Sequence, residues 1–331
     1  MATSDLNATL PTWAALAEAQ ACTGLLLGNG ASRAVWRTFN YPSLFERAQQ
    51  VRNRPLAQTD LALFKALGTE SFTQVLVALG NTARVNAALT ISSTAPLNRY
   101  YSIKEALIHA VRSLHITWQQ LNPANLAAIN RALRHYRTVY SSNYDLLCHW
   151  AVWHNMAGFD DLMDPDDGFD ARRLASSATR VLYLHGGLHL VRNRDGSTRQ
   201  RAAGGSELLD GFAINTPGDV PLLVNEGHSE DKLRTIGQNA YLSAALQQLA
   251  THRGALCVFG HQLGTQDAHL VHAVRSARPE RIAVSIFPLS DAWVISQKAH
   301  YRSLLGDVAA LSFFDATSHP LGAPGLLHRP G

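Results

Sequence analysis

The stretch that most constrains this fold is residues 23–32, TGLLLGNGAS, where a short apolar run ends in a Gly-Asn-Gly turn. Such a run predicts a buried parallel strand, and the turn predicts a tight connection into a helix. Glycine allows close backbone approach, and the free N–H groups at a helix start attract phosphate. The fragment Gly28-x-Gly30 alone is a weak dinucleotide fingerprint, because Arg33 stands where a third glycine is usual. A tight βα turn without a ligand therefore remains an alternative.

The rest of the chain alternates short apolar runs with helical patterns, which predicts an α/β, Rossmann-like fold. Its sheet should be mostly parallel and covered by helices on both faces, with ligands at the carboxyl ends of the strands. The predicted strands after the first are 138–141, 181–184, 221–224, 255–259, 281–286 and 309–313. The predicted helices between them are 146–153, 231–250, 267–277 and 290–305.

We expect a single domain over residues 1–331, with 44–133 as a helical insertion or cap after the first βα unit. That region has apolar residues at helical spacing and no confident strand. An opening helix is expected over 13–22, and an exposed loop or hairpin over 192–205. The proline-containing tail from Thr317 should be loosely held.

Composition narrows the class of protein. Of 331 residues, 46% are hydrophobic and 16% charged, which excludes a disordered chain. We expect no membrane segment and no secretory signal, hence a cytoplasmic location, because the chain has neither a long apolar run nor a basic N-terminus before an apolar core. Three cysteines without a CxxC pair disfavour disulfides and a zinc ribbon. The arginines are scattered, so no nucleic-acid groove is expected.

Glycine, Asn, Asp and His gather where the predicted strands end. Asn143 and Asp145 alternate along an extended end and could face one side, although Asn-x-Asp is also typical of a turn entering a helix. His185 is followed by two glycines that would leave it accessible as an acid or base. The strand ends are 28–32, 142–145, 185–187, 225–227 and 260–264.

Other chemical motifs are absent or incomplete. Asp267-x-His269-x-x-His272 lies on a predicted helix but lacks a convincing third ligand, so no metal is expected. The sequence contains no HExxH, no GxSxG and no Walker-type phosphate loop.

Four of these motifs, GNGAS, SNYD, LHG and FGHQLGTQDAHL, occur in an order that resembles the sirtuin-like domains of bacterial antiphage defence proteins. The resemblance covers about Leu25 to Ala273. It implies a Rossmann-like sheet with a helical insertion, and hydrolysis of NAD to nicotinamide and ADP-ribose. NAD depletion by such domains halts infected cells.

The resemblance also implies roles for individual residues. Asn143 would lie by the nicotinamide ribose and position water, and Asp145 would hold the carboxamide. His185 would be the acid/base residue near the ribose hydroxyls. Gly260 and Asp267 would line the adenosine side. The residues that would cradle the pyrophosphate are Gly28, Asn29, Gly30, Ala31 and Ser32.

The chain departs from the sirtuin pattern in three places. It cannot form the four-cysteine zinc module of the deacetylases, which disfavours deacetylation. Phe39-Asn40-Tyr41-Pro42 replaces the acidic, arginine-containing loop, and Gln262 stands where the family often has Ser. An NAD hydrolase needs a gate, so we expect a homo-oligomer or a neighbouring-gene defence protein as partner. A nucleotide-binding sensor without turnover and an enzyme for another nucleotide remain alternatives.

Overall fold

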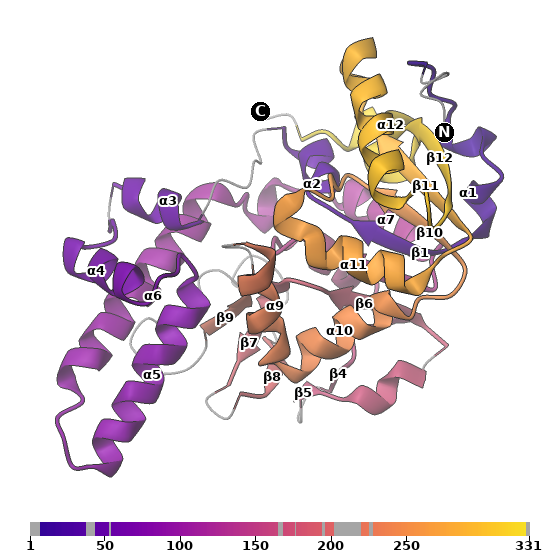
Figure 1. Cartoon of the computed structure of the whole chain (residues 1–331). Helices are drawn as coiled ribbons and strands as arrows, with labels where there is room; N and C mark the ends of the chain where they lie inside the picture. The colour runs from indigo at the N-terminus through magenta and orange to yellow at the C-terminus, as the bar shows by residue number, and fades with distance from the viewer. Residues whose placement is uncertain are drawn as a thin grey trace.

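The computed structural model describes residues 7–37, 44–52, 54–164, 168–175, 177–193, 196–201, 220–224 and 228–328. Its centre is a parallel sheet of seven strands in the order β12-β11-β10-β1-β2-β6-β3, flanked by helices (Figure 1). The predicted Rossmann-like α/β fold is confirmed. The strands are β1 (Cys22–Leu27), β2 (Thr138–Ser141), β3 (Phe159–Asp160), β6 (Thr179–Tyr183), β10 (Ala255–Phe259), β11 (Arg281–Ile286) and β12 (Ala310–Asp315).

The central strands are apolar throughout because both of their faces are buried. Leu25 and Leu27 of β1 face one hydrophobic core, and Leu26 between them faces the other. Helices α10, α11 and α12 cover the second face, while α2, α7 and α8 cover the first. The helices are α1 (Glu18–Ala21), α2 (Gly30–Val35), α3 (Leu44–Gln50), α4 (Gln58–Ala66), α5 (Phe72–Ala88), α6 (Thr94–Leu114), α7 (Pro123–Leu133), α8 (Leu147–His154), α9 (Ser229–Gly237), α10 (Ala240–Ala250), α11 (Ala268–Ala277) and α12 (Asp291–Leu305).

The region 44–133 is helical as predicted, from α3 to α7. Helices α5 and α6 form a long antiparallel hairpin that extends away from the sheet (Figure 1). Helix α7 instead packs beside α8 against the sheet, so the projecting part ends with α6. Among the described residues, none of these helices combines the length and apolarity needed to cross a membrane.

A small antiparallel sheet, absent from the sequence prediction, follows β6 directly. It has the order β8-β7-β9, with β7 at Gly186–Arg192, β8 at Thr198–Gln200 and β9 at Val220–Leu223. The expectation that 221–224 adds a strand to the parallel sheet is therefore wrong. The hairpin expected near 192–205 is seen as far as residue 201. A two-stranded antiparallel ribbon, β4 (Met163–Asp164) with β5 (Gly168–Phe169), follows β3 along the chain.

Three further expectations need correction. The opening helix is a 3-10 turn at Trp13–Ala15 followed by the single turn of α1, and Cys22 already belongs to β1. The helix expected over 231–250 is broken at Asn239, whose side chain caps α10 by accepting the Leu242 N–H. The C-terminal segment is held firmly as far as 328, with Leu321 and Leu326 buried.

Two buried histidines lie between α8 and the small sheet. The rings of His149 and His189 stack at 4.2 Å between centroids, with 2% and 0% of each residue exposed. Burial lowers the pKa of His149 to about 3, and burial also lowers the pKa of His189 well below its usual range. Both rings are therefore neutral in the folded protein near neutral pH.

Because His149 and His189 are buried in their neutral form, we predict that the protein loses stability in acid. The unfolded chain takes up a proton on His149 near pH 6.5, whereas the folded chain does so only near pH 3, so the free energy of unfolding falls as pH falls through this window. His149→Phe keeps a stacking ring but removes the titration. Urea unfolding from pH 6.5 to 4 should show a shallower pH slope, by about one proton. Equal slopes for the wild type and His149→Phe would contradict the prediction.

Candidate functional site

The β1–α2 turn lies at the point where the sheet changes direction. After β1 the chain builds β2 and then β6 on one side, and it later places β10 on the other. The crevice at such a switch point is where open α/β sheets bind ligands. Gly28 and Gly30 from the turn, and Gly260 after β10, lie there.

The glycines at this crevice allow the backbones of two loops, the β1–α2 turn and the loop after β10, to lie in direct contact. Gly28 N donates to Phe259 O (2.9 Å), and Gly30 N donates to Gly260 O (2.8 Å). A Cβ on Gly30 would lie 2.5 Å from the Cα of Gly260, and Gly260 itself has φ +65°. These N–H groups are therefore used within the protein, although the turn has the predicted position.

Ser32 on the first turn of α2 joins the turn to the end of β2. Its hydroxyl donates to Asp145 Oδ2 (2.6 Å), and the Nδ2 of Asn143 lies 3.3 Å from its Oγ and donates to Gly28 O (3.1 Å). Asp145 is fully buried, and its Oδ1 accepts the Leu147 N–H at the start of α8. The helix-entry interpretation of Asp145 is confirmed; its suggested contact with a carboxamide stays a prediction.

One buried acceptor at this edge has no partner in the described part of the chain. It is the Oδ1 of Asn29, the central residue of the turn. Close by, a small and mostly apolar cavity lies among Leu27, Ser32, Asn143 and Leu321, with room for about one water molecule. Leu321 comes from the C-terminal segment, which thus covers this edge.

His185 lies two residues after β6 and is 5% exposed. The expectation that the following glycines open access to it is wrong. Gly186, at φ +72°, allows β7 to pass close to β9, since a Cβ there would lie 1.9 Å from Leu222 O. His185 is instead buried, and its ring lies beside that of His269 from α11, with 5.0 Å between the ring centroids.

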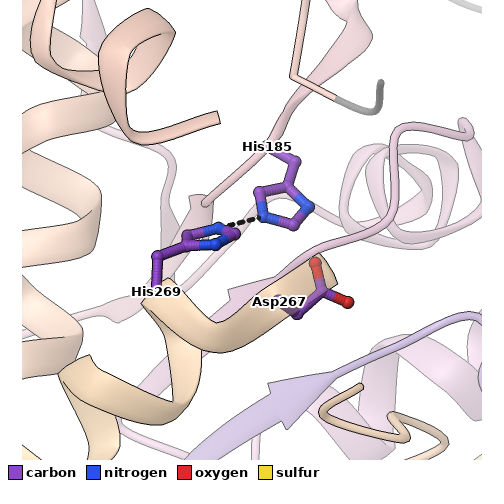
Figure 2. A group of neighbouring side chains, drawn as sticks. All are labelled: His185, Asp267 and His269. Carbon is purple, nitrogen blue, oxygen red and sulfur yellow. Dashed lines mark hydrogen bonds between the residues drawn. The ribbon is translucent and has the colours of Figure 1, made fainter. Parts of the chain in front are cut away.

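His269, which the sequence offered only as a metal ligand beside His272, is the direct partner of His185. The Nε2 atoms of His185 and His269 are 2.8 Å apart (Figure 2). His269 is 3% exposed, and Ser229 Oγ lies 3.1 Å from its Nδ1 and accepts its backbone N–H (2.9 Å). His272, one turn further along α11, is exposed and takes no part.

Asp267 completes this cluster with a buried lysine. Lys232 Nζ donates to Asp267 Oδ1 at 2.9 Å, and the lysine side chain is only 6% exposed. Burial raises the pKa of Asp267, but His185, His261 and Lys232 around it lower it to about 2. Burial lowers the pKa of His185 well below its usual range and that of His269 to about 4, with Lys232 contributing to both. The cluster thus holds one ion pair and neutral imidazoles.

The other predicted site residues take different positions. Ala31 is a buried residue of α2 itself. The side chain of Gln262 is exposed, while its carbonyl accepts from His300 Nε2 (2.9 Å). The segments 39–42 and 225–227 lie outside the described residues.

A family profile, described as a domain of unknown function, matches residues 25–321. The chain belongs to the DUF4917 family. The match runs from β1 to the C-terminal segment over the cavity, so this DUF4917 domain includes both the glycine crevice and the histidine cluster. No curated protein matches the sequence. The resemblance to sirtuin-like domains stays a prediction.

The crevice yields a test of its close packing. Gly30→Ala places a methyl group against the backbone of Gly260, so the free energy of unfolding should fall by about 2–3 kcal/mol. Gly264→Ala in the same loop meets nothing within 4 Å and should change stability by less than about 0.5 kcal/mol. Denaturant unfolding measures the free energy of unfolding of both variants. Similar losses in the two would show that the close contact between Gly30 and Gly260 does not determine the effect.

Proposed function

We propose that this chain is an NAD glycohydrolase that releases nicotinamide and ADP-ribose. The observation that carries the proposal is the order of three adjacent strands. Because β1, β2 and β6 are neighbours, the Gly28–Ser32 turn, Asn143 and His185 follow consecutive strands at one edge, beside the switch point. The unpartnered Oδ1 of Asn29 adds an acceptor suited to a ribose hydroxyl or an amide N–H.

These residue types suit the reaction. Cleavage of the bond to nicotinamide develops positive charge on the ribose, as in glycoside hydrolysis. Nicotinamide leaves as a neutral molecule, so orientation of the ribose and delivery of water are the main requirements. In this proposal Asn143 orients ribose and water, and neutral His185 accepts a proton. Asp145 acts by fixing Ser32 and the start of α8.

The described edge is closed, which fits an enzyme that is silent at rest. The cavity beside Asn143 holds about one water molecule, far less than a dinucleotide. Binding of NAD therefore requires Leu321 and the segment that carries it to move. In the proposed role, an NAD-depleting effector of antiphage defence, self-assembly or a neighbouring-gene partner supplies this opening.

A second candidate is nucleotide binding without turnover. It is favoured by the position of the Asn143 amide, which already donates to Gly28 O inside the protein. Such a sensor would bind NAD through the same turn and release no product.

One assay separates the two functions. The purified chain is incubated with NAD, alone and after concentration-dependent assembly, and the products are resolved by chromatography. Hydrolysis predicts nicotinamide release that falls at least about 100-fold in Asn143→Ala and in His185→Ala. His272→Ala, an exposed change on α11, should keep wild-type activity.

Thermal unfolding of each variant shows whether activity is lost because a catalytic group is missing or because the protein no longer folds. Saturable NAD binding without product, in assembled protein as well, would favour the sensor. A chain that neither binds nor cleaves NAD would exclude both candidates.

A further inference from the structure

The cluster at His185 has features that the proposed hydrolysis does not need. Two imidazole nitrogens face each other at 2.8 Å, and Asp267 lies beside them, with one ligand atom from each residue within 4.8 Å of the others (Figure 2). The residues come from two separate segments: His185 lies just after β6, Asp267 is the last residue before α11, and His269 lies in the first turn of α11.

Two histidines and one carboxylate form the donor set of many zinc sites that keep an open position. Tetrahedral ligands about 2.0–2.1 Å from Zn²⁺ lie about 3.3 Å apart. The two Nε2 atoms would need to separate by only about 0.5 Å from their present 2.8 Å, which small side-chain rotations supply. Asp267, with 23% of its side chain exposed, provides the side from which an ion enters.

Ser229 supports His269 in either protonation state. When His269 carries the proton on Nε2, the serine hydroxyl donates to its Nδ1; when His269 Nε2 instead accepts a proton from His185 or binds a metal, the serine accepts from Nδ1–H. A group that holds the far nitrogen of a ligating histidine in this way is typical of metal sites. Lys232 opposes a cation, because its ammonium lies on Asp267.

We propose that His185, His269 and Asp267 form a binding site for a divalent transition metal, of which Zn²⁺ is the best match, and that its occupation inhibits the enzyme. The inhibitory half rests on the proposed function. A metal on the Nε2 of His185 takes the lone pair that would otherwise accept a proton. The site is thus used either for metal or for proton transfer.

The test of the site uses Co²⁺ as a visible probe on the full chain after treatment with chelator. We expect one Co²⁺ per chain with the absorption of a low-coordinate N/O site, displaced by Zn²⁺. His269→Gln and Asp267→Asn should abolish it, and Ser229→Ala should weaken it roughly tenfold. The matched control His272→Ala, on the same helix but exposed, should bind as the wild type does.

Lys232→Met gives a result that misfolding cannot imitate. Removing the ammonium should tighten Co²⁺ binding roughly tenfold, because the competing charge is gone. Added metal should also raise the thermal stability of this variant more than that of the wild type. Two results would contradict the proposed site. One is equal Co²⁺ affinity in the wild type and His269→Gln. The other is that neither the wild type nor Lys232→Met binds Co²⁺.

The inhibitory half is tested separately. In wild-type protein, Zn²⁺ at the concentration that fills the site should stop nicotinamide release, and chelator should restore it. If protein saturated with Zn²⁺ still releases nicotinamide, the proposed inhibition is wrong, although the metal site itself would stand. A chain without NAD hydrolysis would refute the proposed function, and the Co²⁺ measurements would still decide the metal site.

Discussion

The backbone contact between the β1–α2 turn and the loop after β10 is the constraint on which the candidate site depends. Gly28 N and Gly30 N donate across the crevice to Phe259 O and Gly260 O, which requires glycine on both sides. This contact fixes the start of α2 and so places Ser32 beside Asp145 and Asn143. The glycines thus hold the edge of the sheet together, and a ligand can use only the groups that this packing leaves unpaired, as on Asn29.

The parallel sheet could be predicted because its strands are buried on both faces and therefore form uninterrupted apolar runs. The helix after β2 was expected over 146–153, and α8 spans Leu147–His154. The small antiparallel sheet was not, because His185-Gly186-Gly187 has the composition of a ligand loop, and the structure uses Gly186 to start a strand against Leu222. Local composition does not reveal whether a glycine makes room for a ligand or for another strand.

The residues of the candidate site likewise fall into those that the sequence could predict and those that it could not. Asn143, Asp145 and His185 follow predicted strands, so their gathering at one edge could be expected from topology alone. The partners of His185 could not, because Lys232 and Ser229 lie on α9 and His269 on α11, and only the packing of these helices brings them to β6. Along the sequence the nearest histidine to His269 is His272, but the two lie in different environments, because His269 is buried and His272 is exposed.

The two polar networks of this edge differ in how their charges are compensated. Around Asp145, the Ser32 hydroxyl and the Leu147 N–H each donate to one oxygen of a fully buried carboxylate, which leaves that network little chemical freedom. Around Asp267, a lysine supplies the opposite charge, and the adjacent imidazoles remain neutral with two nitrogens at 2.8 Å. Two lone pairs cannot face each other at this distance unoccupied, so the pair must hold a proton or a cation between them. The proposed metal site rests on this difference, because only the network around Asp267 has a nitrogen pair with a carboxylate beside it.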